Sequence, residues 1–182
     1  GVQYVACAGN FKDAGLEYTG ALKVLQMIFS YEYLWIQIRV KGGAYGCMCS
    51  FSDQGDSMFV TYRDPNLSES YKVYDEAADY VADFDADDRD MKKYIIGTIG
   101  SMDMPMEAVD MGARSFHAYF LGKTEADLQK VRDQVLSCTQ EDIRALAPIV
   151  KAVVEAGNRC CIGNEEKIDQ NKEYFDEVKH VL

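Results

Sequence analysis

The most constraining feature of the sequence is the stretch of residues 21–41, which contains neither glycine nor proline. Apolar side chains recur through this stretch at helical spacing, and they occupy two sides of the helix. One side carries Leu22, Leu25 and Phe29, and the other carries Val24, Ile28, Tyr31, Trp35 and Ile38. A helix that is apolar over most of its circumference is buried in the core. The stretch therefore predicts a central helix, and Thr19 is placed to cap its start.

Four shorter segments have the character of β-strands. Residues 2–8 alternate in a way that suits a strand with both faces at least partly covered. Residues 47–51 and 58–62 are β-prone and flank residues 52–57, whose glycine and aspartates favour turns, so together they predict a hairpin. Residues 159–162 predict a final strand.

The rest of the chain shows helical spacing. Asn66 followed by Glu69 resembles a capping box, and it precedes apolar residues at positions 71–81. Further helices are predicted by apolar residues spaced through residues 91–98, 106–120, 128–135 and 143–153.

Two more pairs, Thr124 with Asp127 and Thr139 with Asp142, have the spacing of helix caps. Pro148 is expected to kink or split the helix that follows the second pair, because proline lacks an N–H group and clashes with the preceding turn. A terminal helix is expected from about Asp169.

This order of elements predicts an α+β fold in which residues 1–182 form a single domain. Its helices are expected to pack on a mixed, largely antiparallel sheet of about four strands. A chain of 182 residues is long enough to bury a substantial core without disulfide bonds.

Charge and hydropathy exclude two classes of partner. The longest unbroken apolar run, residues 4–8, is far shorter than the ~20 residues that span a bilayer, so no membrane partner is predicted. The net charge is −11 and the basic residues are scattered, so no nucleic-acid partner is predicted. The sequence shown begins without an export signal, because Gly1 leads directly into strand-like residues.

The residues that most often bind metals do not form a recognisable set. The six cysteines include no C-x-x-C pair, and His117 and His180 are the only histidines. We therefore expect reduced thiols, no metal site and no bound cofactor in this chain. Reduced thiols point to the cytoplasm or another reducing compartment, such as an organelle matrix if the source is eukaryotic.

The acidic run of residues 83–90 invites comparison with a calcium-binding loop. Such a loop needs glycine at its sixth position and glutamate at its twelfth, where this chain has Asp88 and Tyr94. The expected role of these carboxylates is instead to stabilise the N-terminal turn of the following helix.

Residues 39–46, RVKGGAYG, are the strongest candidate for chemistry. The spacing of the glycines matches neither phosphate-binding motif. It places Arg39 in the last turn of the central helix and Tyr45 just before a strand, on either side of two glycines. A guanidinium and a phenol are donors suited to a peptide carbonyl that gains negative charge. The sequence leaves a second interpretation open, in which Arg39 complements the helix dipole and Tyr45 fills the core.

Five segments, taken in order, extend this interpretation: YEYLWIQIRVKGGAYG, SFSDQGDSMFVTYRDPNL, IIGTIGSMD, LGKTEADLQKVRDQVLSCTQEDIRAL and CCIGNEEKI. Together they resemble the C-terminal domain of the presequence-protease branch of the pitrilysin/insulinase zinc metallopeptidases, from Gln3 to about Val178. The pairing of RVKGGAYG with YRDPN is the specific part. The resemblance implies a LuxS/mitochondrial-processing-peptidase-like metallohydrolase domain.

In that family, four similar domains form two bowl-shaped halves around a closed chamber in which short unfolded peptides are cut. The resemblance implies that Arg39 and Tyr45 reach the zinc site of the first domain, contact the substrate carbonyl and stabilise the tetrahedral intermediate. The family's zinc is held by an inverted H-x-x-E-H helix and a downstream glutamate. Two histidines as far apart as His117 and His180 cannot build that motif.

The resemblance therefore implies a fragment of a larger zinc endopeptidase that is inactive alone. Its expected partners are unfolded peptide substrates and the remaining domains of the same parent chain, which would hold the zinc. The alternative is a non-catalytic binding or scaffold subunit of a peptidase-like complex, because some relatives work as pairs in which one chain has lost the metal motif. A third hypothesis is a free peptide-binding module. If carboxylates line the chamber, basic peptides would be attracted.

Overall fold

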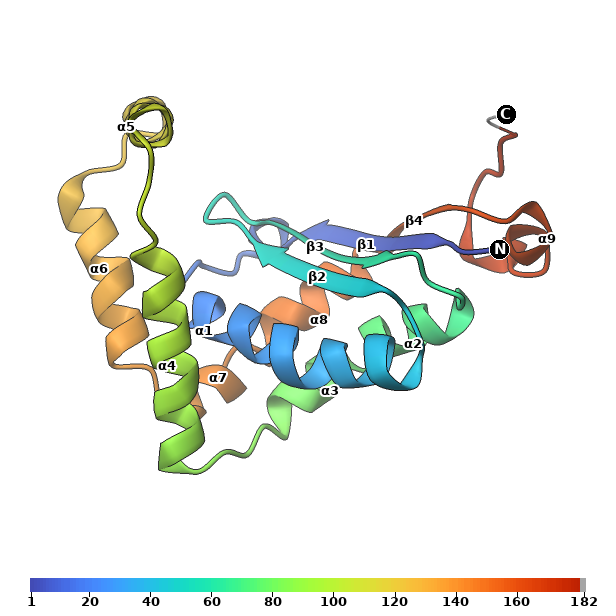
Figure 1. Ribbon diagram of the computed structural model, residues 1–182, viewed down its shortest axis with the longest axis horizontal. Helices are drawn as coiled ribbons and strands as arrows, with labels where there is room; N and C mark the ends of the chain where they lie inside the picture. Colours follow the sequence, from blue (N-terminus) through green and yellow to red (C-terminus); the bar gives the residue numbers. More distant parts are fainter. Residues whose placement is uncertain (181–182) are drawn as a thin grey trace.

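The computed structural model describes residues 1–180, which form a layer of helices on a four-stranded sheet (Figure 1). The strands are β1 (Tyr4–Asn10), β2 (Gly46–Phe51), β3 (Asp56–Tyr62) and β4 (Asn158–Ile162). They lie in the order β2-β3-β1-β4. All three pairings are antiparallel. The predicted α+β fold and its four strands are confirmed, but the described residues contain no parallel pair, so the sheet is not mixed.

The helices follow the order of the sequence. They are α1 (Ala21–Ile28), η2 (Phe29–Tyr33), η3 (Trp35–Lys41), α2 (Ser68–Asp75), α3 (Ala77–Ala82), α4 (Asp88–Met102), α5 (Ala108–Phe120), α6 (Glu125–Leu136), α7 (Gln140–Arg144), α8 (Ala147–Glu155) and α9 (Glu165–Asp169). Two 3-10 turns, η1 (Phe11–Ala14) and η4 (Lys172–Tyr174), complete the structure. Within residues 1–180, no helix combines the length and apolar character that crossing a bilayer requires.

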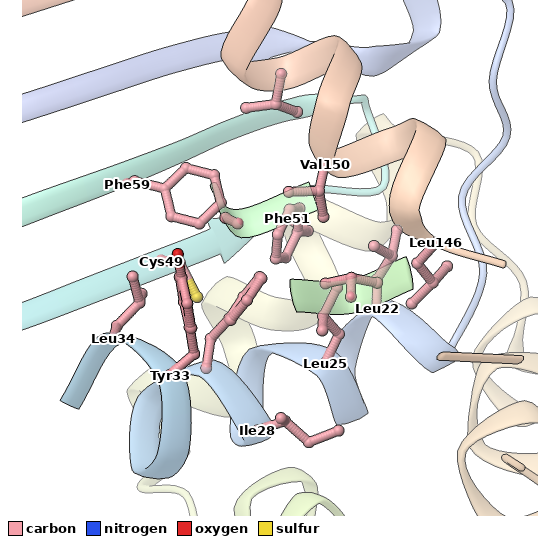
Figure 2. Close-up of a cluster of buried hydrophobic side chains, with 14 of the residues drawn as sticks. Leu22, Leu25, Ile28, Tyr33, Leu34, Cys49, Phe51, Phe59, Leu146 and Val150 are labelled. Carbon is pink, nitrogen blue, oxygen red and sulfur yellow. The ribbon is translucent and has the colours of Figure 1, made fainter. Parts of the chain in front are cut away.

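The core lies between the sheet and the central helix. Leu22, Leu25 and Ile28 of α1 are fully buried; Leu22 and Leu25 point towards the strands, whereas Ile28 lies on the side of the helix away from them (Figure 2). Phe51 and Phe59 meet them from the sheet, while side chains from α7 and α8 close the other side. Burying an aliphatic or aromatic side chain of this size stabilises a fold by about 1.5–3 kcal/mol. This cluster therefore fixes the central helix against the sheet.

The predicted central helix is present, but its second half has a different geometry. The chain is α-helical through Ile28 and then forms the π-helical segments η2 and η3, which end at Lys41. The Leu34 N–H bonds the Phe29 carbonyl, five residues back. Apolar spacing indicates a helix without distinguishing four-residue from five-residue hydrogen bonds. The π segments were therefore not predicted.

Two predicted helix caps are corrected by the structure. The N-cap residue of α1 is Gly20 instead of Thr19, although the Thr19 hydroxyl accepts from the Ala21 N–H at 3.5 Å; the Gly20 N–H donates to the Gln134 side chain of α6 at 2.8 Å. Asn66 does not form a capping box with Glu69, because its side-chain amide donates to the Gly42 carbonyl at 2.6 Å. In both cases a partner far away in sequence takes part. The helix predicted from positions 71–81 is also divided, into α2 and α3.

The other two caps are confirmed. Thr124 with Asp127 and Thr139 with Asp142 each form a complete capping box. Pro148 lies in the first turn of α8, so the helix predicted over residues 143–153 is split, as expected. The predicted terminal helix is wrong, because α9 ends at Asp169, where that helix was expected to begin. Asn164 caps α9 by accepting from the Lys167 N–H at 3.0 Å.

The two faces of the sheet have different surroundings. The covered face carries buried residues such as Val5, Cys7 and Phe59, and it packs against α1, α2 and α8. No helix lies over the other face in Figure 1. We call this second face the open face. Leaving out Asn10, Gly46 and Asp56 at the ends of the strands, it comprises Tyr4, Ala6, Ala8, Met48, Ser50, Met58, Val60, Tyr62, Asn158, Cys160 and Ile162. Helices therefore cover only one face of the strand predicted at residues 2–8.

One helix stands outside the layers. The helices α4 and α6 lie side by side, and α5 crosses the far end of this pair, where Figure 1 shows it along its axis. None of the residues of α5 is buried, although it carries exposed apolar side chains including Val109, Phe116 and Phe120. The sequence correctly predicted this helix, but no other part of residues 1–180 covers it.

Candidate functional site

The site predicted at residues 39–46 is the turn that connects η3 to β2. The Gly42 N–H bonds the Gln37 carbonyl at 3.0 Å, and the Gly43 N–H bonds the Arg39 carbonyl at 3.0 Å. Gly43 has φ of 80°, which favours glycine, so one of the two glycines ends the helix as expected. A Cβ atom at Gly42 would lie 2.5 Å from the Ile38 carbonyl oxygen. Glycine is therefore favoured at position 43 by the backbone conformation and at position 42 by the lack of space for a Cβ atom.

Arg39 lies half-buried on η3, and its guanidinium stacks over the ring of Trp35. The guanidinium carbon is 4.0 Å from the ring centroid. A cation–π contact at a partly exposed site stabilises this arrangement by about 0.5–1 kcal/mol. Burial raises the pKa of the Cys47 thiol on β2 to about 11, and the positive charge of Arg39 acts in the opposite direction. The stacking on Trp35 therefore orients Arg39, and the positive charge of Arg39 acts on the pKa of Cys47 near the start of β2.

Tyr45 follows the turn and points away from the core. Its side chain is 65% exposed, which is incompatible with the interpretation that it fills the core. Its backbone N–H donates to the Arg63 carbonyl at 3.3 Å, and its ring meets the Tyr62 ring edge-on, with centroids 5.6 Å apart. The backbone bond and the ring contact hold Tyr45 at the end of the sheet with its phenol directed outward.

Arg39 and Tyr45 share one further property. Among the hydrogen bonds and ion pairs of residues 1–180, none involves the Arg39 guanidinium or the Tyr45 hydroxyl. No hydrogen bond or cation–π contact joins the two side chains, and the structure places them on the two sides of one turn. Because both groups are donors that the protein leaves available, both can bind an external acceptor.

The residues that follow β3 stabilise the turn between η3 and β2. Arg63 has φ of 48°, a left-handed conformation that is uncommon outside glycine. The buried Asp64 carboxylate accepts from the Asn66 N–H at 2.9 Å and from the Ser70 hydroxyl at 2.6 Å. Asn66 in turn binds the Gly42 carbonyl. The segment YRDPN therefore connects β3 to the glycine turn, which gives a physical reason for its pairing with RVKGGAYG.

Sequence reasoning missed Trp35, Tyr62 and Asn66 as parts of this site. Trp35 precedes Arg39 by four residues on the same helix, a spacing at which side chains meet, so this signal was present. The contacts of Tyr62 and Asn66 depend on the tertiary fold, and no sequence spacing indicates them. Trp35 also lines a surface pocket of about 510 Å³ between α1 and α4.

The chain's own residues do not fit a zinc ion. Residues 1–180 contain no group of three histidine, cysteine or acidic side chains that could hold a metal. His117 lies on the exposed helix α5, and the His180 Nδ1 is 3.4 Å from a Glu165 carboxylate oxygen.

The carboxylates of residues 83–90, expected to stabilise the start of the following helix, do so in part. Asp87 caps α4 by accepting from the Asp90 N–H at 2.9 Å, and Asp88 lies in its first turn. Asp83 instead ends α3, and Asp85 lies 3.6 Å from the Arg144 guanidinium.

The cysteines do not form a nucleophilic site. All six are free thiols, and Cys7, Cys49 and Cys138 are buried. Burial raises the pKa of Cys7 to about 11 and that of Cys138 to about 12, which keeps both thiols protonated near neutral pH.

Comparison with known families identifies the family of this chain. A family model described as "PreP C-terminal domain" matches residues 1–164. The chain belongs to this family. The resemblance inferred from the motifs is therefore confirmed at the level of the family.

Individual relatives agree with this assignment. The chain is 42% identical to Protein HypA of Clostridium perfringens over 181 residues, covering 100% of this chain and 19% of that protein. It is 34% identical to Presequence protease 1, chloroplastic/mitochondrial, of Arabidopsis thaliana over 185 residues, covering 100% of this chain and 17% of the relative. The chain thus spans less than one fifth of the length of these relatives.

A solved structure shows the same fold. The crystal structure of a Bordetella pertussis protein described as a zinc protease superposes with a TM-score of 0.65 and 15% sequence identity, covering 88% of this chain and 92% of that chain. At this identity the comparison supports the fold alone. The predicted fold class is confirmed by it.

Proposed function

We propose that residues 1–182 are the C-terminal domain of a larger zinc-dependent endopeptidase that degrades short unfolded peptides. Membership of the PreP C-terminal domain family supports this proposal, as do relatives whose chains are more than five times as long. The zinc ion belongs to another part of the parent chain in this proposal, since residues 1–180 offer no fitting set of ligands. The domain alone is then inactive.

The main observation behind the proposal is that one turn carries two hydrogen-bond donors, the Arg39 guanidinium and the Tyr45 hydroxyl, that have no partner among residues 1–180. When a peptide bond is attacked, its carbonyl oxygen gains negative charge. In the proposal, the Arg39 guanidinium and the Tyr45 hydroxyl donate to that oxygen and stabilise the tetrahedral intermediate. Trp35 holds Arg39, and Tyr62 holds the Tyr45 ring, so little reorganisation is needed. The domain also contributes part of the wall that encloses the peptide.

The free thiols are consistent with a reducing compartment as the place of action, either the cytoplasm or an organelle matrix. The Arabidopsis relative is named for chloroplast and mitochondrion, which supports the organelle matrix for a eukaryotic source.

The test is Tyr45→Phe in the full-length parent enzyme. This change removes one hydroxyl and keeps the ring contact with Tyr62. Loss of one donor to the developing oxyanion is expected to lower kcat about a hundredfold with a much smaller change in KM. Steady-state kinetics on a defined unfolded peptide provide the measurement.

Tyr119→Phe is the matched control, because Tyr119 is exposed on α5 and lies outside the site. It should leave kcat and KM unchanged. Unchanged turnover in Tyr45→Phe would contradict the assigned role and favour the alternative, a non-catalytic binding or scaffold subunit.

A further inference from the structure

The open face of the sheet is apolar although nothing in residues 1–180 covers it. Its large side chains, Tyr4, Met48, Met58, Tyr62 and Ile162, are between 36% and 64% exposed. None of the residues of the open face is charged, whereas charged residues make up 27% of the whole chain. Asp56 at its border is bound by Asn10, whose side-chain amide donates to the carboxylate at 2.9 Å.

The register of the strands makes this face continuous. Val60 of β3 lies between Met48 of β2 and Ala6 of β1. One pair further along, Met58 lies opposite Ser50 on β2. The apolar side chains therefore extend across neighbouring strands without a charged group between them, which is the character of a contact surface.

The open face is also continuous with the candidate site. The Tyr45 ring contacts the Tyr62 ring, and the Tyr62 ring contacts the Tyr4 ring edge-on, with centroids 5.5 Å apart. The three rings form a path from the turn onto the sheet. A peptide whose carbonyl is held at Tyr45 would therefore have its neighbouring residues next to the open face.

We propose that the open face binds the apolar side chains of the peptide substrate that flank the cut bond. This proposal rests on the proposed function and names its substrate class: unfolded peptides with aliphatic or aromatic residues near the cut site. Methionine side chains are flexible and polarizable, so Met48 and Met58 can adapt to apolar groups of different shapes. The open face carries no carboxylate, so it does not supply the attraction for basic peptides that carboxylates lining the chamber would give.

The experiment uses the full-length parent enzyme and two peptides. The peptides have equal length and net charge and differ only beside the cut bond, where one carries Leu and Phe and the other carries Ser and Asn. The double variant Met48→Gln/Met58→Gln keeps the size of both side chains and makes them polar. We expect its kcat/KM to fall roughly tenfold for the apolar peptide and to stay unchanged for the polar peptide.

A matched control comes from a helix that lies outside the sheet. Ile96→Gln changes an apolar residue of α4 that is 71% exposed and lies outside the open face. It should leave kcat/KM unchanged for both peptides. A loss in the double variant that is equal for both peptides, or no loss for either, would overturn the proposal.

Two further measurements separate this proposal from its alternatives. Tyr45→Phe should lower kcat for both peptides; if it does not, the proposed function fails, while the comparison of the two peptides still tests the open face. Analytical ultracentrifugation of the parent enzyme tests whether a second copy covers the face. An oligomer in the unmodified enzyme that dissociates in the double variant would overturn the assignment to substrate.

Discussion

The two faces of the sheet are built from alternate residues of the same strands, yet they have opposite surroundings. On β3, Phe59 is fully buried under the central helix, whereas its neighbour Met58 points outward and is exposed. Both faces are rich in apolar side chains. Alternation of side chains along a strand therefore shows which residues share a face. The apolar character of a face does not show whether the surface that covers it comes from the same chain.

The helices α1 and α5 show the same distinction. The apolar face of α1 is buried against the sheet, and Leu22 and Leu25 are fully inaccessible. The apolar residues of α5 have the same helical spacing, and none of them is buried. Spacing predicted both helices with equal success because it depends on the local backbone. What covers each helix depends on the rest of the fold.

The comparison of the faces is tested most strongly by truncating one residue on each side of β3. Phe59→Ala should lower the free energy of unfolding by about 3–5 kcal/mol, because it leaves a cavity under α1. Met58→Ala on the open face should change it by less than about 1 kcal/mol. Chemical denaturation of the 182-residue chain measures both. Similar losses for the two variants would show that the open face is packed in solution.

A second test uses two thiols on the covered face of the sheet, the buried Cys7 and the half-buried Cys161. Burial raises the pKa of Cys7 and of Cys161 to about 11, above the ordinary value of 9.0. Between pH 9 and pH 11 the unfolded chain loses these protons while the folded chain keeps them. The free energy of unfolding is therefore expected to be independent of these thiols below pH 9 and to fall as the pH rises towards 11.

Denaturation curves across this pH range provide the measurement. Cys7→Ala should make the fall shallower, because it removes one of the thiols whose pKa burial raises, whereas Ser50→Ala, which changes a non-ionisable residue of the open face, should leave the slope as it is. A stability that stays constant from pH 8 to pH 11 would contradict burial of these thiols.

The smallest effect is a difference in chemical labelling, which leaves stability unchanged. Cys160 and Cys161 are adjacent on β4 and belong to opposite faces, so Cys160 is exposed while Cys161 is half-buried with a raised pKa. A brief treatment with iodoacetamide near neutral pH should modify Cys160 first. Fragment-ion mass spectrometry distinguishes the two residues, and equal labelling in urea is the control. Faster labelling of Cys161 would reverse the assignment of the faces.

Contacts between residues close together in the sequence were predicted, and contacts between residues far apart in the sequence were not. The caps at Thr124 and Thr139 were predicted because their partners lie three residues away. The start of α1 and the role of Asn66 were not, because Gln134 and Gly42 are brought to them only by the fold. Contacts of this second kind have no signature in local spacing.

The candidate site shows the same limit. Arg39 and Tyr45 were found from their positions around two glycines and from the family resemblance, and their catalytic role stays a prediction. The exposure of Tyr45 and the stacking of Arg39 on Trp35 became visible only in three dimensions. The open face was the least accessible to sequence analysis, because its continuity depends on the register of four strands.

The π-helical segments determine where the helix can tolerate a change in chain length. A π-helical turn holds about one more residue than an α-helical turn, because its hydrogen bonds reach five residues back instead of four. Deleting one residue within η2 would therefore restore α-helical hydrogen bonding and leave the later residues close to their original phase. A deletion within α1 would instead rotate Ile38 and Arg39 by roughly 100° about the axis. Protein engineers who shorten this helix should consequently remove a residue from η2 and leave α1 intact.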